Sequence, residues 1–126
     1  MALKHAAPGQ VVDLRPFGSR LAAARTSAIV RTPHFEAVRL VVPAGTEIPS
    51  HKVSGQITLY CVEGHAQLGL TGETIDLRAG NWVYLEGDEP HSVKGIEDAS
   101  LLLNILFLSN RNVQDRQDVA STRASD

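Results

Sequence analysis

Short apolar runs separated by turn residues recur along the middle of the chain. In residues 35–42, Val38, Leu40 and Val42 share one face of an extended segment, and the alternate positions share the other. Turn signals such as Ser54-Gly55 separate this segment from further predicted strands at residues 57–62, 66–70, 74–77, 81–85, 91–94 and 100–108. Many short strands with regular turns predict an all-β sandwich or barrel rather than alternating strands and helices.

The pattern is weaker at both ends of the chain. We expect residues 1–32 to form an N-terminal arm with a short strand at 11–14, a brief helix at 20–25 capped by Ser19, and a strand at 26–32. The barrel is then expected over residues 33–108. Residues 109–126 are polar and nearly free of large apolar side chains, so we expect a C-terminal tail.

Composition narrows the function classes. The chain has 126 residues, which fits one domain, and its 12 basic and 14 acidic side chains give a formal charge of −2. This balance and the lack of a basic cluster argue against a nucleic-acid partner. No apolar stretch resembles a signal peptide or a membrane span, so a cytoplasmic protein without a membrane partner is expected. The single cysteine, Cys61, is predicted to be a small buried residue.

Two segments that begin with glycine each carry one histidine beside a strand. The first resembles the first motif of the cupin superfamily, G-x5-H-x-H-x3-E-x6-G, with the frame occupied by Gly45, His51, Val53, Ile57 and Gly64.

The second segment resembles the second cupin motif, G-x5-P-x-G-x2-H-x3-N. Its frame is occupied by Gly80, Glu86, Asp88, His91 and Gly95. The resemblance covers about residues 35–108 and implies a double-stranded β-helix, the jelly-roll barrel of small single-domain cupins.

The resemblance also implies a metal held by three histidines and one glutamate, but Val53 and Ile57 replace two of these four ligands. Only His51 and His91 remain, which is one ligand fewer than a catalytic metal site generally uses. Two interpretations stay open. The histidines are hydrogen-bonded pocket residues without a metal, or they bind Fe, Mn, Ni or Zn at partial occupancy with help from water or Gln56.

Other residues are candidates for the same pocket. Gln56 neighbours the lost glutamate position and would face inward only if Gly55 formed a bulge. Acidic residues near the motifs are interpreted as solvated turn residues: Glu47, Glu86, Asp88 and Glu89. Side chains with a polar group in an apolar strand are expected to line the cavity: Tyr60, Trp82, Tyr84 and Asn104. Arg39 is expected at an exposed edge, and three histidines at the surface: His5, His34 and His65.

The sequence leaves three alternative functions open. The first is a small-molecule-binding cupin of unknown ligand with a degenerate two-histidine pocket. The second is a metal-dependent enzyme, dioxygenase-like or isomerase-like, that uses His51 and His91. A purely structural role is a third. The resemblance also implies a homodimer, with N-terminal strands of the arm exchanged between copies.

Overall fold

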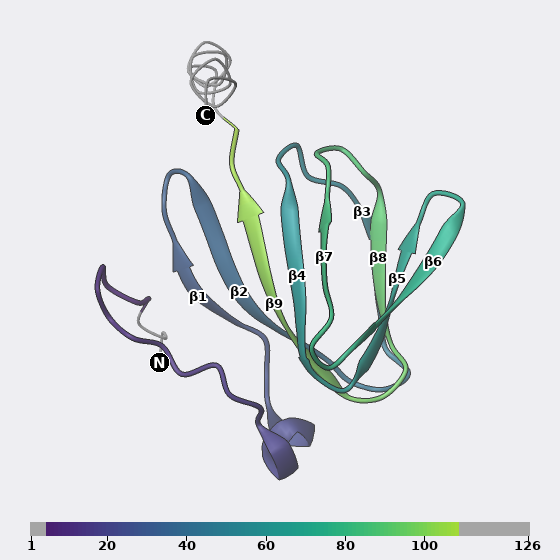
Figure 1. Cartoon of the computed structure of the whole chain (residues 1–126), viewed down its shortest axis with the longest axis horizontal. Helices are drawn as coiled ribbons and strands as arrows, with labels where there is room; N and C mark the ends of the chain where they lie inside the picture. Colours follow the sequence, from purple (N-terminus) through teal and green to yellow (C-terminus); the bar gives the residue numbers. More distant parts are fainter. Residues whose placement is uncertain (1–4, 109–126) are drawn as a thin grey trace.

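The computed structural model describes residues 5–108, which form two antiparallel sheets packed face to face (Figure 1). A five-stranded sheet has the order β1-β2-β9-β4-β7 and a four-stranded sheet the order β3-β8-β5-β6. The strands are β1 (Ser27–Arg31), β2 (Phe35–Val42), β3 (Glu47–His51), β4 (Ile57–Glu63), β5 (His65–Leu70), β6 (Glu73–Arg78), β7 (Trp82–Leu85), β8 (His91–Gly95) and β9 (Ala99–Leu106). The predicted all-β jelly roll is confirmed.

Strand alternation builds the core between the sheets. Leu59 and Cys61 of β4 and Leu101 of β9 point inward and are almost completely buried, as is Leu68 from the opposite sheet. Cys61 is therefore a core residue, as predicted, and burial raises the pKa of its thiol. Residues 5–108 contain no helix that is long and apolar enough to cross a membrane.

β3 was not predicted, because Pro49 and Gly45 indicated a turn. Pro49 is tolerated because β3 is an edge strand, where a missing N–H does not break a central ladder. The register between β3 and β8 shifts between Ile48 and His51, so the strand is irregular at the proline.

The arm also departs from prediction. The expected helix at 20–25 is a 3₁₀ helix, η1 (Gly18–Ala23), and Ser19 lies inside it while Phe17 occupies the cap position without a side-chain bond. The expected strand at 11–14 does not form, and Val11 is 92% exposed. The strand expected at 26–32 is β1, which pairs with β2 of the same chain. Residues 1–4 and the predicted tail at 109–126 lie outside the described residues.

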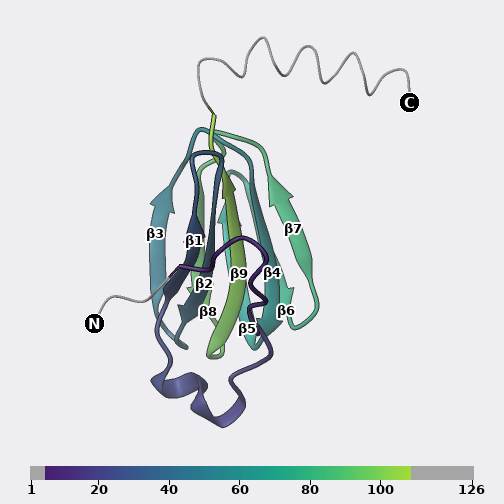
Figure 2. The same cartoon turned by 90° about the vertical axis from the view of Figure 1, so that its left-hand side faces the viewer.

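The arm is attached to the barrel through the carboxylate of Glu63. In Figure 2 the arm passes in front of the five-stranded sheet. At the end of the arm, the backbone N–H groups of Phe17 and Gly18 donate hydrogen bonds to the Glu63 carboxylate, at 2.8 and 3.1 Å. The same carboxylate accepts a hydrogen bond from the Ser100 hydroxyl at 2.7 Å. One side chain of the barrel therefore holds the chain at the start of η1.

Arg39 completes this attachment and is buried, with 7% exposure, so the prediction of an exposed edge position is wrong. Its Nη2 donates to the backbone oxygen of Arg15 at 2.7 Å and lies 3.6 Å from Glu63 Oε2, and its guanidinium stacks 3.8 Å from the ring centre of Phe17. The arm covers a position that would otherwise face solvent.

Burial raises the pKa of Glu63, but the hydrogen bonds from Phe17, Ser100 and Gly18 outweigh it and hold the pKa below its ordinary value of 4.5. A depressed carboxyl pKa stabilises the fold above the pKa of the unfolded chain. That stabilisation is lost as the pH falls through the lower pKa of the folded state.

We expect Glu63→Ala to lower the free energy of unfolding by about 3 kcal/mol, because it leaves Arg39 buried without its carboxylate. Urea unfolding at pH 7 measures this. The exposed Glu73 provides the control, and Glu73→Ala should change stability by less than about 0.5 kcal/mol. The difference in the free energy of unfolding between the wild type and Glu63→Gln should shrink as the pH falls below about 4.5. Equal effects at positions 63 and 73 would show that Glu63 does not hold the arm.

Candidate functional site

His51 and His91 lie together because β3 ends where β8 begins. The two residues face each other in the β3–β8 ladder, and their ring centroids are 4.5 Å apart with planes inclined by 56°. His91 is 5% exposed, whereas His51 is exposed. The predicted convergence of two imidazoles that are forty positions apart is therefore present in the structure.

Each imidazole is oriented by a backbone carbonyl two residues before it. His51 Nδ1 lies 3.0 Å from the oxygen of Pro49, and His91 Nδ1 lies 2.9 Å from the oxygen of Glu89. A carbonyl oxygen only accepts hydrogen bonds, so each Nδ1 carries the proton and donates. In the neutral imidazole, the Nε2 of each ring is then an unprotonated acceptor.

The imidazoles line a cavity of about 120 Å³ inside the barrel. Apart from the two rings its wall is aliphatic, and the lining residues are Leu40, Ile48, His51, Ile57, Leu59, His91, Val93 and Leu103. Of the six aliphatic residues, the sequence alone placed only Ile57 at the site. Strand alternation put Leu40 on one face with Val38 and Val42 but did not show that this face is inward. A cavity of about 150 Å³ takes benzene, so this one accepts a group of slightly smaller size.

A metal centre with three or more protein ligands does not fit these residues. Ile57, at the position of the family's glutamate, forms part of the aliphatic wall, and Val53 is half-buried against the core. Within residues 5–108 no group of three or more His, Cys, Asp or Glu side chains is close enough to hold an ion. The donor set is two nitrogen atoms in an apolar wall, which is one protein ligand fewer than a catalytic metal site generally uses.

Gln56 does not reach this cavity. It is exposed, and its amide donates to both oxygens of Glu86, at 3.2 and 3.3 Å, on the outside of the barrel end. It lines a separate hollow with Ser54, Gly87 and residues 106–108 at and just after the end of β9. The bulge at Gly55 that would have turned Gln56 inward is absent, because β4 begins at Ile57 with its side chain in the core.

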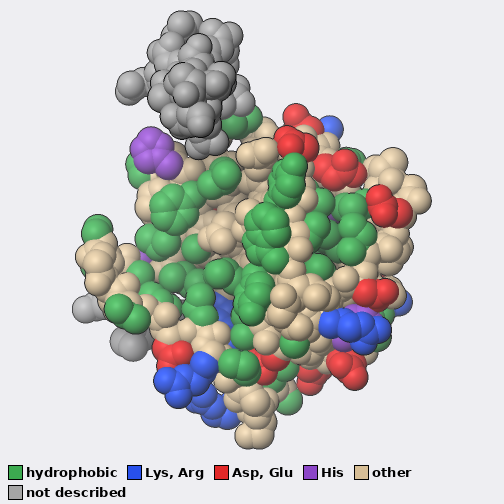
Figure 3. Space-filling model, viewed as in Figure 1, with side chains coloured by type: hydrophobic (Ala, Val, Ile, Leu, Met, Phe, Trp, Pro, Cys, Tyr) green, Lys and Arg blue, Asp and Glu red, His purple; other side chains and the backbone are tan. Residues whose placement is uncertain are grey.

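The aromatic residues expected in the cavity lie on the opposite face of the sheet. Tyr60, Trp82 and Tyr84 are 40%, 59% and 52% exposed. Figure 3 shows hydrophobic side chains gathered on the surface over β9, β4 and β7. Asn104 also faces outward, where its amide donates to the Thr58 hydroxyl at 3.1 Å. The expectation that these four line the cavity is wrong, since Val83 and Leu59 take the inward positions.

The remaining histidines divide into two groups. His5 and His34 are exposed, as expected. His65 is buried, with 8% exposure, contrary to the surface position expected from its place at a strand start. Its Nε2 lies 2.7 Å from Asp76 Oδ1 across the β5–β6 ladder, and this hydrogen bond lowers the pKa of Asp76. The pair lies on the outer face of the four-stranded sheet, and neither residue lines the two-histidine cavity.

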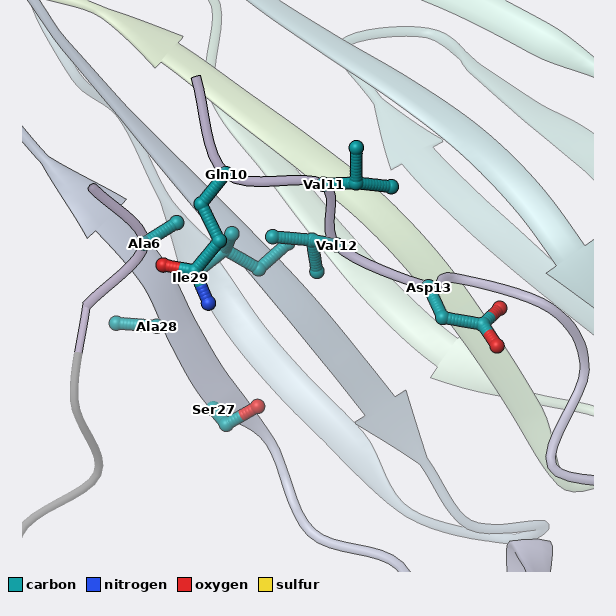
Figure 4. A pocket seen from close by; sticks show the side chains of 8 residues that line it. All are labelled: Ala6, Gln10, Val11, Val12, Asp13, Ser27, Ala28 and Ile29. Carbon is teal, nitrogen blue, oxygen red and sulfur yellow. The ribbon is translucent and has the colours of Figure 1, made fainter. Parts of the chain in front are cut away.

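A larger hollow, of about 380 Å³, lies between the arm and β1 (Figure 4). Its walls are Ala6 and residues 10–13 on one side and residues 27–29 on the other. The one ionisable residue in its wall, Asp13, is paired with Arg15 at 2.7 Å. The wall of this hollow therefore offers no cluster of ionisable side chains that could bind or transform a ligand. The two-histidine cavity remains the candidate site.

The loops beside the histidines are packed backbone against backbone. A Cβ atom at Gly55 would overlap the carbonyl oxygen of Leu106, and one at Gly87 would overlap that of Ser54. The loop before β4, the loop after β7 and the end of β9 are therefore in direct contact at this end of the barrel.

The paired sheets and the two-histidine end define a jelly-roll barrel of the cupin class. The family model for the cupin domain matches residues 38–107, which is more than half of the chain. The chain belongs to the cupin family, and the resemblance drawn from the two glycine–histidine segments is confirmed. No curated protein sequence matches this chain significantly.

Solved structures agree on the fold. A conserved protein of unknown function from Streptococcus pyogenes has a TM-score of 0.67 at 16% identity, with 86% of this chain and 96% of that chain covered. An RmlC-like cupin from Desulfovibrio desulfuricans has a TM-score of 0.65 at 20% identity, with coverage of 77% and 96%. A salicylate 1,2-dioxygenase from Pseudoaminobacter salicylatoxidans, in complex with gentisate, has a TM-score of 0.60 at 20% identity, with coverage of 64% and 24%.

We expect Gly55→Ala to lower the free energy of unfolding by about 3 kcal/mol, because the new methyl group meets backbone that cannot rotate away. Gly69→Ala is the matched control. Its methyl group would meet the Ser92 hydroxyl, which can turn aside, and the cost should stay below about 1 kcal/mol. Chemical unfolding of both variants measures the contrast, and equal costs would show that the barrel end is not tightly packed.

Proposed function

We propose that this cupin binds a small, mainly apolar molecule in the two-histidine cavity. One observation carries the proposal: an aliphatic cavity of about 120 Å³ has two imidazoles in its wall, each oriented by a backbone carbonyl. Pockets that bind small molecules combine an apolar wall with a few placed polar groups, and this cavity has that composition.

The size of the cavity supports a small ligand, or a small part of a larger one that extends past the exposed His51. The salicylate dioxygenase structure is a complex with gentisate, so one protein with a similar domain binds a small molecule. At 20% identity that likeness concerns the fold alone, so it is the cavity of this chain that indicates the size and chemistry of the ligand.

The alternative is a metal-dependent enzyme, dioxygenase-like or isomerase-like, in which His51 and His91 hold Fe, Mn, Ni or Zn. One feature favours it: imidazoles that bind metals usually donate the other ring N–H to a backbone carbonyl or carboxylate, as both rings do here. The two-nitrogen donor set argues against it, because residues 5–108 supply no third ligand.

Xenon is a suitable probe of the cavity, because it is smaller than benzene and binds in apolar cavities. We expect it to shift the methyl NMR signals of Leu40, Leu59 and Leu103 in the full-length protein, and Leu103→Phe to abolish these shifts by filling the space. Leu102→Phe, on the outward side of the same strand, is the control and should leave them unchanged. A wild-type protein whose methyl signals do not respond to xenon under pressure would contradict the proposed binding cavity.

Metal content separates the proposal from the alternative. Protein purified without chelator should contain far less than one Fe, Mn, Ni or Zn ion per chain. A stoichiometric ion that disappears in His51→Ala and His91→Ala but not in His34→Ala would establish the alternative instead.

A homodimer formed through the outer face of the five-stranded sheet is a second part of the proposal. Where the arm leaves them uncovered, the outward positions of β4, β7 and β9 carry no charged side chain, and they hold three exposed aromatic residues. Uncharged surfaces rich in Tyr and Trp are typical of interface centres. The outward residues are Thr58, Tyr60, Val62, Trp82, Tyr84, Leu102, Asn104 and Leu106. Exchange of the arm between copies would bring the exposed Val11 into the same interface.

We expect the wild-type protein to have the mass of a dimer in light scattering, and Trp82→Glu to convert it to a monomer by placing a charge in the interface. Lys94→Glu, on the outer face of the other sheet, is the control and should remain dimeric. A monomeric wild type at high micromolar concentration would refute the dimer.

A further inference from the structure

The geometry points to a small organic amine as the ligand: a short aliphatic chain in the cavity and an ammonium group that donates to Nε2 of His51 and of His91. This inference rests on the proposed binding function and specifies its ligand class. Three independent features lead to it: the tautomers of the two rings, the charge of the surrounding loops, and the volume and lining of the cavity.

The tautomers decide what head group the rings can recognise. Both Nδ1 atoms donate to backbone carbonyls, so both neutral rings offer an Nε2 lone pair. A head group that bonds to the two neutral rings must therefore donate hydrogen bonds. A carboxylate only accepts, so at two neutral rings it would meet two acceptors and no donor. An ammonium group has three N–H donors and satisfies both rings, with one donor left for water.

The loops around the histidines carry negative charge. The segment between β7 and β8 contains Glu86, Asp88 and Glu89, whereas the segment between β3 and β4 contains one cation, Lys52. Counted over these two loops, three acidic groups against one basic group leave a net charge of −2. A field of this sign attracts a cation to the entrance and repels an anion.

The cavity decides the length of the aliphatic part. At about 120 Å³ it is somewhat smaller than the space that takes benzene, which has six carbon atoms. A chain of about four carbons fits this volume. Leu40, Leu59, Val93 and Leu103 supply only apolar contacts, so a second polar group on the chain would be left without a partner. The favoured ligand therefore resembles butylammonium.

Three probes of nearly equal size test the head group: butylamine, which is protonated at neutral pH, 1-butanol and butyrate. Binding to full-length, EDTA-treated protein is measured by NMR titration at one pH and ionic strength. We expect butylammonium to bind about tenfold more tightly than butanol, since hydrogen bonds to a charged donor are the stronger ones, and butyrate to bind most weakly. Butyrate binding as tightly as butylammonium would overturn the inference.

Variants separate recognition of the head group from occupation of the cavity. His51→Leu should weaken butylammonium binding about tenfold and leave the xenon shifts in place, because it removes one acceptor but keeps an apolar wall. Neutralising the loop with Glu86→Gln, Asp88→Asn and Glu89→Gln should weaken butylammonium several-fold and butanol hardly at all. Glu73→Gln, outside the loop, is the control.

The outcomes distinguish the two levels of the proposal. If xenon binds but none of the three butyl probes does, or if His51→Leu leaves butylammonium affinity unchanged, the amine inference fails and the binding cavity stands. If xenon also fails to bind, both fail. Nitrogen NMR of the imidazoles adds a direct check, since a protonated Nε2 in either neutral ring would remove the acceptor pair.

Discussion

The ladder between β3 and β8 is the constraint on which the candidate site depends. It places the last residue of one strand opposite the first residue of the other, so His51 and His91 meet without any direct bond between their side chains. Because side chains alternate in a strand, a slip of one residue would send one ring to the outer face. The irregularity at Pro49 lies in this same ladder, and the carbonyl of Pro49 orients His51.

The two sheets give the molecule surfaces of different character. The inward face closes on a small aliphatic space with two nitrogen acceptors. The outward face of the five-stranded sheet is aromatic and uncharged over β4 and β7, and it is covered by the arm near Arg39 and Glu63. The replacement of two family ligands by Val53 and Ile57 fits this division, since Ile57 forms part of the apolar wall. The barrel is that of the cupin family, and the wall of its cavity is aliphatic apart from the two imidazoles.

The sequence predicted the fold well because turns and strand alternation are local signals, and the spacing of Gly45, His51, Gly80 and His91 added the family frame. It predicted less of the site. Alternation shows that Trp82 and Tyr84 share a face, but both faces of β7 are apolar, so it does not show which one is inward. The burial of Arg39 depends on Phe17 and Arg15, which lie more than twenty residues away in the chain, and no local pattern reports such a contact.

The contacts of Gly55 with Leu106 and of Gly87 with Ser54 leave no side chain between three neighbouring strand ends. Such a junction has little freedom to open or to be remodelled by substitution, because any larger residue strikes main chain. Adaptation of this barrel to a different guest would therefore proceed through the aliphatic residues deeper inside, where one methyl group more or less changes the shape of the space. The backbone contacts fix the end of the barrel, and the aliphatic lining of the cavity is the part that substitutions can reshape.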